Sequence, residues 1–336
     1  MSVLEHATNV SINDSAITSV LNTVNANFNI AGTINNNYNS IDGIVELYKH
    51  VATSALHNSI ERSQGPHCAE GTRIQLQSDV MTWLKRQADS EIEKLFLWIL
   101  GAAGSGKSAI AQEIAETCAR ERILAATFFF SFRSVETDSY SLFIPTLAYQ
   151  IALNIPSTRE FIAAAFVNDV AVVRKDFDTQ LDTLILQPIA KARAKSEAEW
   201  KKWPNVIVID GLDECKVEKE QATILRALHK SLKSKDFPFR VLLACRPEEE
   251  MRIFFLEGVG KPCTAMIDLN EDYEVDPDLD IFFRASFATI RTKNRIEEAW
   301  PADESIDELI YRASGQFVYA TTAIERINDP SRRPKE

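Results

Sequence analysis

Residues 101–108 read Gly-Ala-Ala-Gly-Ser-Gly-Lys-Ser and fill every position of the phosphate-binding loop pattern G-x-x-x-x-G-K-[ST]. Residues 95–100, before the loop, form an apolar run of strand length. Residues 108–121, after it, carry apolar side chains at helical spacing. Because strand, glycine loop and helix are the context that the motif needs, the pattern predicts a nucleotide site. The alternative is a glycine-rich turn that binds nothing.

Each residue type in the loop has a physical role. Glycines allow a tight turn that presents backbone N–H groups to phosphate oxygens, and the following helix adds a dipole that favours anions. Lys107 would reach the β- and γ-phosphates, and the Ser108 hydroxyl would bind Mg²⁺. The predicted cofactors are therefore ATP or ADP with Mg²⁺. The expected cofactor-binding residues of the loop are Gly101, Ala102, Ala103, Gly104, Ser105, Gly106, Lys107 and Ser108.

Apolar runs alternate with helical segments along the rest of the chain. Near-continuous apolar runs are typical of parallel strands that are covered on both faces, and they occur at 123–132, 205–210, 240–245 and 264–269. Helical character is found at 107–121, 139–168, 180–200 and 217–234. This alternation predicts an α/β fold: a P-loop NTPase with a parallel β-sheet flanked by helices, followed by a small helical bundle at 281–328.

Composition divides the chain into five expected parts. They are an Asn-rich segment at 1–43, a helical linker at 44–90, a nucleotide-binding α/β domain at 91–270, a small helical subdomain at 271–328 and a polar tail at 329–336. Within the linker, 44–62 and 73–87 each have the spacing of one helix. Residues 270–280 are acidic but lack the ordered spacing of a calcium loop, so they are interpreted as a solvated connector.

The Asn-rich segment differs in kind from the rest. Between Asn22 and Asn39 it holds eight asparagines interleaved with apolar residues, without proline or charge. Such a composition suits cross-β stacking, which predicts a self-assembling tail. A disordered polar tail, or a β-hairpin that packs on its own domain, is the alternative.

The net charge of −11 argues against general nucleic-acid binding, because that binding depends on neutralising phosphates. The five cysteines are scattered without a C-x-x-C pair, as expected for free thiols in a reducing compartment. The opening residues do not resemble a secretory signal, and no uncharged apolar stretch approaches the length of a membrane span. A cytoplasmic protein is the expectation.

A second motif complements the phosphate loop. The apolar run 205–210 ends at Asp210, which is predicted to emerge at the ligand edge of the sheet and hold Mg²⁺. Asp213 and Glu214 lie on the following turn and would complete the metal shell and polarise the attacking water, in an order that the sequence leaves open. The alternative is a cluster that caps a helix.

Arg246 follows the run 240–245 and suits a γ-phosphate sensor, although it has an alternative role as a partner of the acids at 248–250. Arg133, after 123–132, is a weaker candidate of the same kind. The predicted catalytic residues are thus Asp213, Glu214 and Arg246, and the predicted metal ligands are Ser108 and Asp210.

Together these motifs resemble the NACHT domain, the nucleotide switch of signal-transducing STAND ATPases. The small residue after Asp210 and the following Asp-Glu pair are its particular mark. The flanks are similar to NACHT proteins of mushroom-forming fungi. The residues that carry the resemblance are 101–108, 207–214 and 243–247, with flanking matches at 55–59, 61–62, 68–73, Trp83, 280–283, 300–301 and 314–320.

The resemblance implies an ATP/ADP-controlled switch that forms homo-oligomers when activated, hydrolyses ATP slowly, and signals to protein partners in immunity-like or incompatibility responses. It places Thr72 and Arg73 near the adenine. The adenine-facing proline of many relatives is Phe317 here, which either stacks on the base or belongs to the core. The winged-helix element and sensor repeats of the family are not found before residue 336. A self-assembling scaffold with structural nucleotide, and a P-loop phosphotransferase, are the competing functions.

Overall fold

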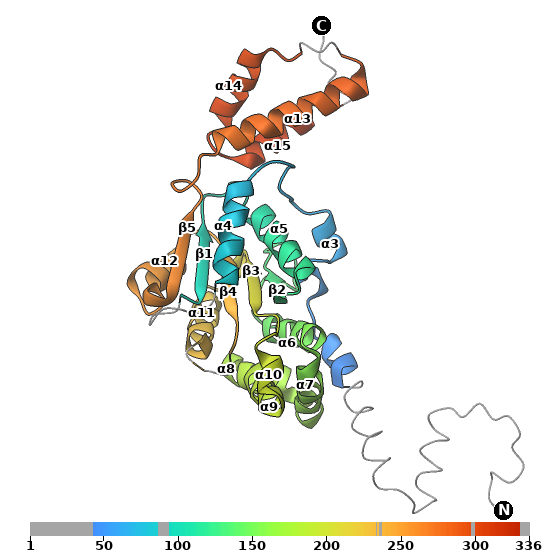
Figure 1. The fold of residues 1–336 in the computed structure, drawn as a ribbon, viewed down its shortest axis with the longest axis vertical. Coiled ribbons are helices and arrows are strands. Elements are labelled where there is room, and N and C mark those ends of the chain that lie inside the picture. Colours follow the sequence, from blue (N-terminus) through green and yellow to red (C-terminus); the bar gives the residue numbers. More distant parts are fainter. Residues whose placement is uncertain (1–42, 87–93, 233, 235–236, 297–299, 330–336) are drawn as a thin grey trace, which may run out of the picture.

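The computed structural model describes residues 43–86, 94–232, 234, 237–296 and 300–329, and its centre is a parallel β-sheet (Figure 1). Five strands pair in the order β2-β3-β4-β1-β5, and every pair is parallel. The strands are β1 (Phe96–Leu100), β2 (Leu124–Phe129), β3 (Val206–Asp210), β4 (Arg240–Ala244) and β5 (Thr264–Asp268). The α/β fold with a parallel sheet flanked by helices is thereby confirmed.

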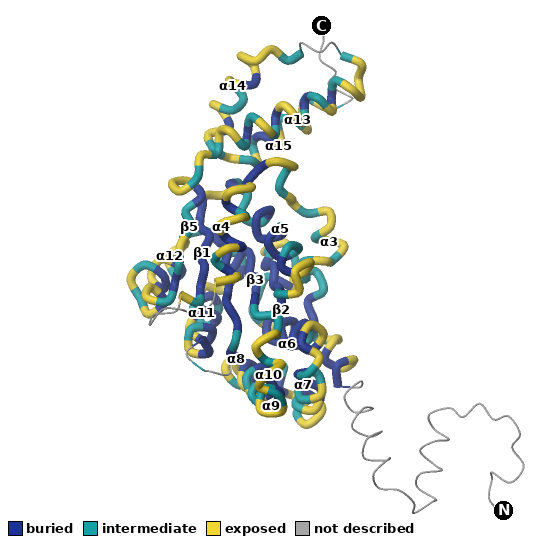
Figure 2. Tube along the Cα trace, in the orientation of Figure 1, coloured by how far each residue is buried: buried dark blue, intermediate teal, exposed yellow. Residues whose placement is uncertain are grey.

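Helices cover both faces of the sheet, which explains why the strands are apolar on both sides. All residues of β1 to β4 are buried, and only the edge strand β5 is partly exposed (Figure 2). Helices α4 (Ile74–Lys85) and α5 (Lys107–Arg120) pack on one face, and the larger apolar core lies on the other. The helices of that second face are α6 (Phe143–Asn154), α7 (Pro156–Asn168), α8 (Phe177–Leu181), α9 (Gln187–Lys195) and α11 (Glu218–Leu232), with short α10 (Glu197–Trp200) and α12 (Glu249–Arg252) at the periphery.

Several predicted elements are shorter than the apolar patterns suggested. The expected helix 139–168 is divided into α6 and α7 at Ile155, because the residue before Pro156 avoids helical backbone angles. The expected helix 180–200 is divided among α8, a π-helical turn (Asp182–Leu186), α9 and α10. The second strand ends at Phe129 rather than at residue 132.

The single helix expected at 44–62 was wrong. Residues 43–48 are helical, and a 3-10 turn (Thr53–Ala55) and the short α3 (Ile60–Ser63) follow. Two contacts account for the break. The Ala52 N–H donates to Thr146 Oγ1 at 2.9 Å instead of to a carbonyl oxygen of its own helix. The Ser59 side chain accepts from the Arg62 N–H and so caps the start of a new helix. The Asn-rich segment lies outside the described residues.

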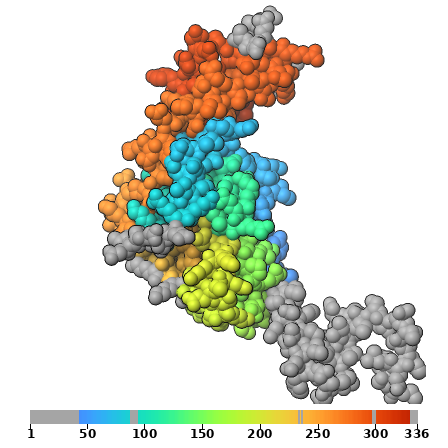
Figure 3. All heavy atoms as spheres, viewed as in Figure 1, coloured from blue at the N-terminus to red at the C-terminus, as the bar shows by residue number. Residues whose placement is uncertain are grey.

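A small helical subdomain stands on the sheet as a separate lobe (Figure 3). It consists of α13 (Asp276–Asn294), α14 (Asp303–Ala313) and α15 (Phe317–Ile327). Leu279, Phe283, Phe287 and Ile306 form its own apolar core. In Figure 1, α13 and α15 lie above the end of the sheet at which α5 begins. None of the helices in the described part of the chain has the length and apolarity that a bilayer crossing requires.

We expect Phe143→Ala to lower the free energy of unfolding by about 3–5 kcal/mol, because the Phe143 ring is fully buried in the larger core among Phe128, Phe130 and Phe177. Urea denaturation measures this change. As a control, Val135→Ala should change stability by less than about 0.5 kcal/mol, since Val135 is 88% exposed. Equal losses in the two variants would contradict this account of the core.

Candidate functional site

The strand order brings the predicted site together. Parallel strands end at one edge of a sheet, and β4 lies between β1 and β3. The phosphate loop after β1, Arg246 after β4 and Asp210 at the end of β3 are therefore neighbours. They line one cavity of about 360 Å³. The predicted site residues on its wall are Thr72, Arg73, Ala103, Gly104, Gly106, Lys107, Ser108, Asp210, Asp213, Glu214 and Arg246.

The remaining loop residues, Gly101, Ala102 and Ser105, belong to the loop but not to the wall of the cavity. Gly101 and Ala102 offer their carbonyl oxygens to the Lys107 ammonium, each at 2.8 Å. Burial lowers the pKa of Lys107, and the charges of Asp213 and Asp210 oppose that shift. Lys107 is thus a partly desolvated cation whose hydrogen bonds stay within its own loop, and a phosphate would be a stronger acceptor for it than neutral carbonyl oxygens.

Glycine is required at two positions of the loop. Gly104 and Gly106 have φ angles of +79° and +94°, which residues with a side chain rarely adopt. At Gly104 a side chain would also overlap Val318 of α15, whose N–H donates to the Gly104 carbonyl oxygen at 3.3 Å. The phosphate loop and the helical subdomain are therefore in direct backbone contact.

Asp210 is the buried carboxyl of the site. It is 3% exposed, and its Oδ1 has no hydrogen-bond partner. Burial raises its pKa to about 6, against opposing contributions from a Ser108 hydrogen bond and the Arg62 charge. A buried carboxylate oxygen without a partner, next to a serine hydroxyl, suits a divalent cation with oxygen ligands. Asp210 and Ser108 thus fit the predicted Mg²⁺.

Arg246 pairs with Asp213 and not with the acids at 248–250, which the sequence suggested as its alternative partners. Its guanidinium Nε lies 3.3 Å from Asp213 Oδ2, and its backbone N–H donates to Asp213 Oδ1. The ion pair therefore joins β4 to the turn after β3, and the acids at 248–250 are not involved. Glu214 accepts a hydrogen bond from the Phe132 N–H, and burial raises the pKa of its carboxyl group.

Arg62 is a site residue that the sequence did not identify. Its Nη2 donates to the Ser108 carbonyl oxygen at 3.4 Å, and its Nε donates to Gln112 Oε1 at 3.0 Å. The guanidinium carbon lies 4.1 Å from the centre of the Phe129 ring. Arg62, which belongs to α3, thus holds the first turn of α5 in position. No local pattern marks it, because its partners are about fifty residues away along the chain.

The helical subdomain and the segment before α4 close the cavity on the side away from the sheet. Arg73 is buried, donates from Nη2 to the Ser105 carbonyl oxygen, and lies 3.6 Å from Asp278 of α13. Its guanidinium carbon is 5.2 Å from the centre of the Phe317 ring. Phe317 lines the cavity and also packs against the subdomain core. Phe282, Val318 and Thr321, which the sequence did not single out, complete this wall.

We expect Asp210→Asn to be more stable than the parent at pH 8 in EDTA. The raised pKa means that ionising Asp210 opposes folding: the penalty is absent below the ordinary pKa near 3.8, grows as pH rises, and is complete above pH 6. A pKa of about 6 in the folded chain against 3.8 ordinarily corresponds to about 3 kcal/mol at most. Thermal unfolding at pH 8 and pH 5 measures it. An advantage that does not shrink at pH 5 would contradict burial as its cause.

We expect Gly104→Ala to lower the melting temperature, since the positive φ would be strained and the new methyl group would overlap Val318. The strain alone amounts to about 1 kcal/mol or more. Val318→Ala combined with Gly104→Ala should restore part of the loss, because it removes the overlap but not the strain. Additive effects in this double-mutant cycle would show that the two residues do not touch.

Comparison with known proteins gives one family and a distant structural likeness. No curated protein matches the chain. Among solved structures, the ORC2 protein of Aeropyrum pernix, determined as ADPNP–ADP complexes, matches with a TM-score of 0.40 and 12% identity. That match covers 78% of this chain and 63% of the ORC2 chain, so this chain spans less than two thirds of the length of that relative.

The family comparison covers the phosphate loop, Asp210 and Arg246 together. The sequence model of the N-terminal region of nephrocystin 3 matches residues 71–246, just over half of the chain. The matched region begins at the segment before α4 and ends directly after β4, so it includes four of the five strands. The chain therefore belongs to the nephrocystin 3 N-terminal family.

Proposed function

We propose that the chain is an ATP/ADP-binding switch of the NACHT type, in which slow Mg²⁺-dependent hydrolysis controls homo-oligomerisation and contact with protein signalling partners. The observation that carries this proposal is the construction of the cavity from two parts of the molecule. The phosphate loop and strand ends form one wall, and α13 and α15 supply the other. A nucleotide held between them would contact both parts, so its loss or hydrolysis would change how they are held together.

Within this proposal each residue has a defined task. Lys107 transfers its hydrogen bonds from the loop carbonyl groups to the β- and γ-phosphates. Ser108 and Asp210 hold Mg²⁺, which supplies charge neutralisation at the phosphates when bound. Arg62 keeps the first turn of α5, and hence Ser108, in position.

The pairing of Arg246 with Asp213 suggests how hydrolysis is divided among the remaining residues. Asp213 is occupied in holding Arg246, whose side chain is 41% exposed and can turn toward a γ-phosphate. Glu214 has a raised pKa and is the better candidate to polarise the attacking water. On this proposal Arg246 senses the γ-phosphate, Asp213 orients the Arg246 guanidinium, and Glu214 polarises the attacking water.

Arg73 and Val318 connect this chemistry to the subdomain. Arg73 contacts the phosphate loop through Ser105 and α13 through Asp278, and Val318 contacts Gly104. A phosphate loop that changes shape on losing a γ-phosphate would alter both contacts at once. The helical subdomain is thus the part whose movement we expect to expose an oligomerisation surface.

The first experiment is to denature the purified protein and measure the nucleotide that is released. We expect near-stoichiometric ADP from the parent, because a switch retains its product, and almost none from Lys107→Ala. Lys85→Ala is the matched control, since Lys85 forms a surface ion pair with Glu121 on the far end of α5. A Lys107→Ala protein that binds as much nucleotide as the parent would overturn the proposal.

A further inference from the structure

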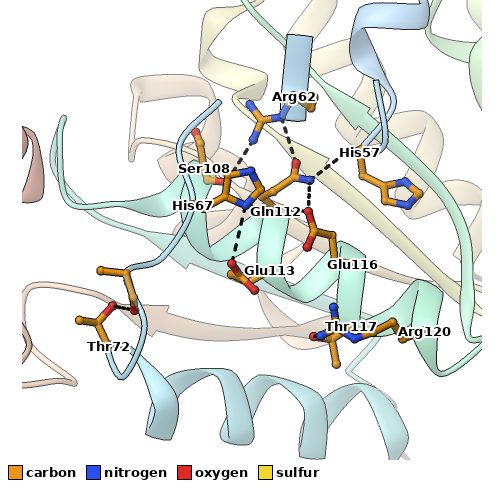
Figure 4. Close-up of polar contacts among 11 residues, drawn as sticks. His57, Arg62, His67, Thr72, Ser108, Gln112, Glu113, Glu116, Thr117 and Arg120 are labelled. Atoms are coloured by element: carbon orange, nitrogen blue, oxygen red, sulfur yellow. Dashed lines mark hydrogen bonds and ion pairs between the residues drawn. The ribbon is translucent and has the colours of Figure 1, made fainter. Parts of the chain in front are cut away.

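Beside the nucleotide cavity, a histidine and two glutamates meet at the surface of α5 (Figure 4). Glu113 and Glu116 lie three residues apart on α5 and therefore on one face of the helix. His67 lies in the loop between α3 and α4, and its ring reaches toward both carboxylates. The three ligand atoms all lie within 4.8 Å of one another.

The distances are those of ligands around an ion. His67 Nδ1 is 3.7 Å from Glu113 Oε1 and 3.9 Å from Glu116 Oε1, too far for direct hydrogen bonds. Zinc binds nitrogen and oxygen at about 2.0–2.2 Å in a tetrahedron, which separates neighbouring ligand atoms by roughly 3.4 Å. Small movements of these exposed and partly exposed side chains, about 1 Å for the most widely separated pair, would therefore place all three atoms around one ion.

A buried amide orients one of the carboxylates. Gln112 is fully buried, and its Nε2 donates to Glu116 Oε1 at 2.8 Å and to the His57 carbonyl oxygen at 2.7 Å. Its Oε1 accepts from Arg62 Nε, so every part of the amide is engaged. Ligating carboxylates are commonly held in this way by a second layer of hydrogen bonds. Glu116 is thus presented by the interior of the protein rather than free at the surface.

Neither carboxylate forms an ion pair with a side chain of fixed charge in the described ranges. No lysine or arginine there lies within ion-pair distance of Glu113 or Glu116, and the fixed charge that acts on Glu116 is the more distant Arg62. A divalent ion would compensate them, and the imidazole would add a ligand that Mg²⁺ and Ca²⁺ do not favour.

We propose that His67, Glu113 and Glu116 form a site for a divalent transition ion such as Zn²⁺, separate from the Mg²⁺ position at Ser108 and Asp210. Along α5, Glu113 and Glu116 lie about 8 and 12 Å beyond Ser108. Three protein ligands leave the fourth position to water. Because Pro66, His67 and Cys68 also line the nucleotide cavity, the ion would tie one wall of that cavity to the helix that begins at the phosphate loop.

The test is calorimetric titration of Zn²⁺ into the full chain with Mg²⁺ in excess, which occupies weaker acidic sites. We expect one Zn²⁺ per chain. His67→Ala, Glu113→Gln and Glu116→Gln should each weaken binding at least tenfold. Glu121→Gln, just beyond the end of the same helix, is the matched control and should leave binding unchanged. Zn²⁺ should raise the melting temperature of the parent and of Glu121→Gln but not of His67→Ala.

The neighbouring thiol provides a second control. Cys68 is half-buried, and its Sγ is not among the three ligand atoms that lie together, so Cys68→Ser should bind Zn²⁺ as the parent does. The absence of a one-to-one site in the parent, an unchanged site in His67→Ala, or loss of the site in Cys68→Ser would each overturn the proposal. Comparison of melting temperatures without metal shows whether each variant is folded; His67 is exposed and both glutamates are partly exposed.

Discussion

The candidate site depends on the fact that parallel strands end at the same edge of a sheet. Hydrogen bonding of β3 to β4 and of β4 to β1 places three chain segments side by side, although β1 lies more than a hundred residues from the other two in the chain. The phosphate loop, Arg246 and Asp210 each follow one of these strands directly. Their arrangement therefore requires no special contact of their own. It is held by the apolar packing that buries the strands from both faces.

The burial that stabilises the sheet also disfavours charged side chains at the edge where the candidate site lies, because they lose contact with water. Asp210 is the last residue of a fully buried strand, so its carboxyl group loses solvent while its neighbours gain packing. Lys107, Asp213 and Glu214 share the same partly desolvated space. The divalent ion and nucleotide proposed for this site would offset the cost of this desolvation by supplying opposite charge, and on that proposal their binding would stabilise the fold.

The parts that follow from local sequence were predictable, and those that follow from long-range contacts were not. Continuous apolar runs and the loop motif located the strands and the residues between Gly101 and Ser108. Pro156 carried a signal that the helix 139–168 is divided, but the apolar periodicity concealed it. For Arg62 and Val318, no local pattern in the sequence indicates that they contact the phosphate loop or the start of α5. Arg62 belongs to the site through Ser108 and Gln112, and Val318 through Gly104, and these pairings exist only once the chain has folded.

The contact between Arg73 and Asp278 joins residues that are 205 positions apart in the chain. Val318 reaches Gly104 over a similar separation. During synthesis the phosphate loop would leave the ribosome long before α13 and α15, and closing so long a loop is entropically costly. We therefore expect the cavity to be among the last features of the molecule to form. Retention of nucleotide would then report on a finished chain, and a nascent sheet would remain without its far wall until the helical subdomain had docked.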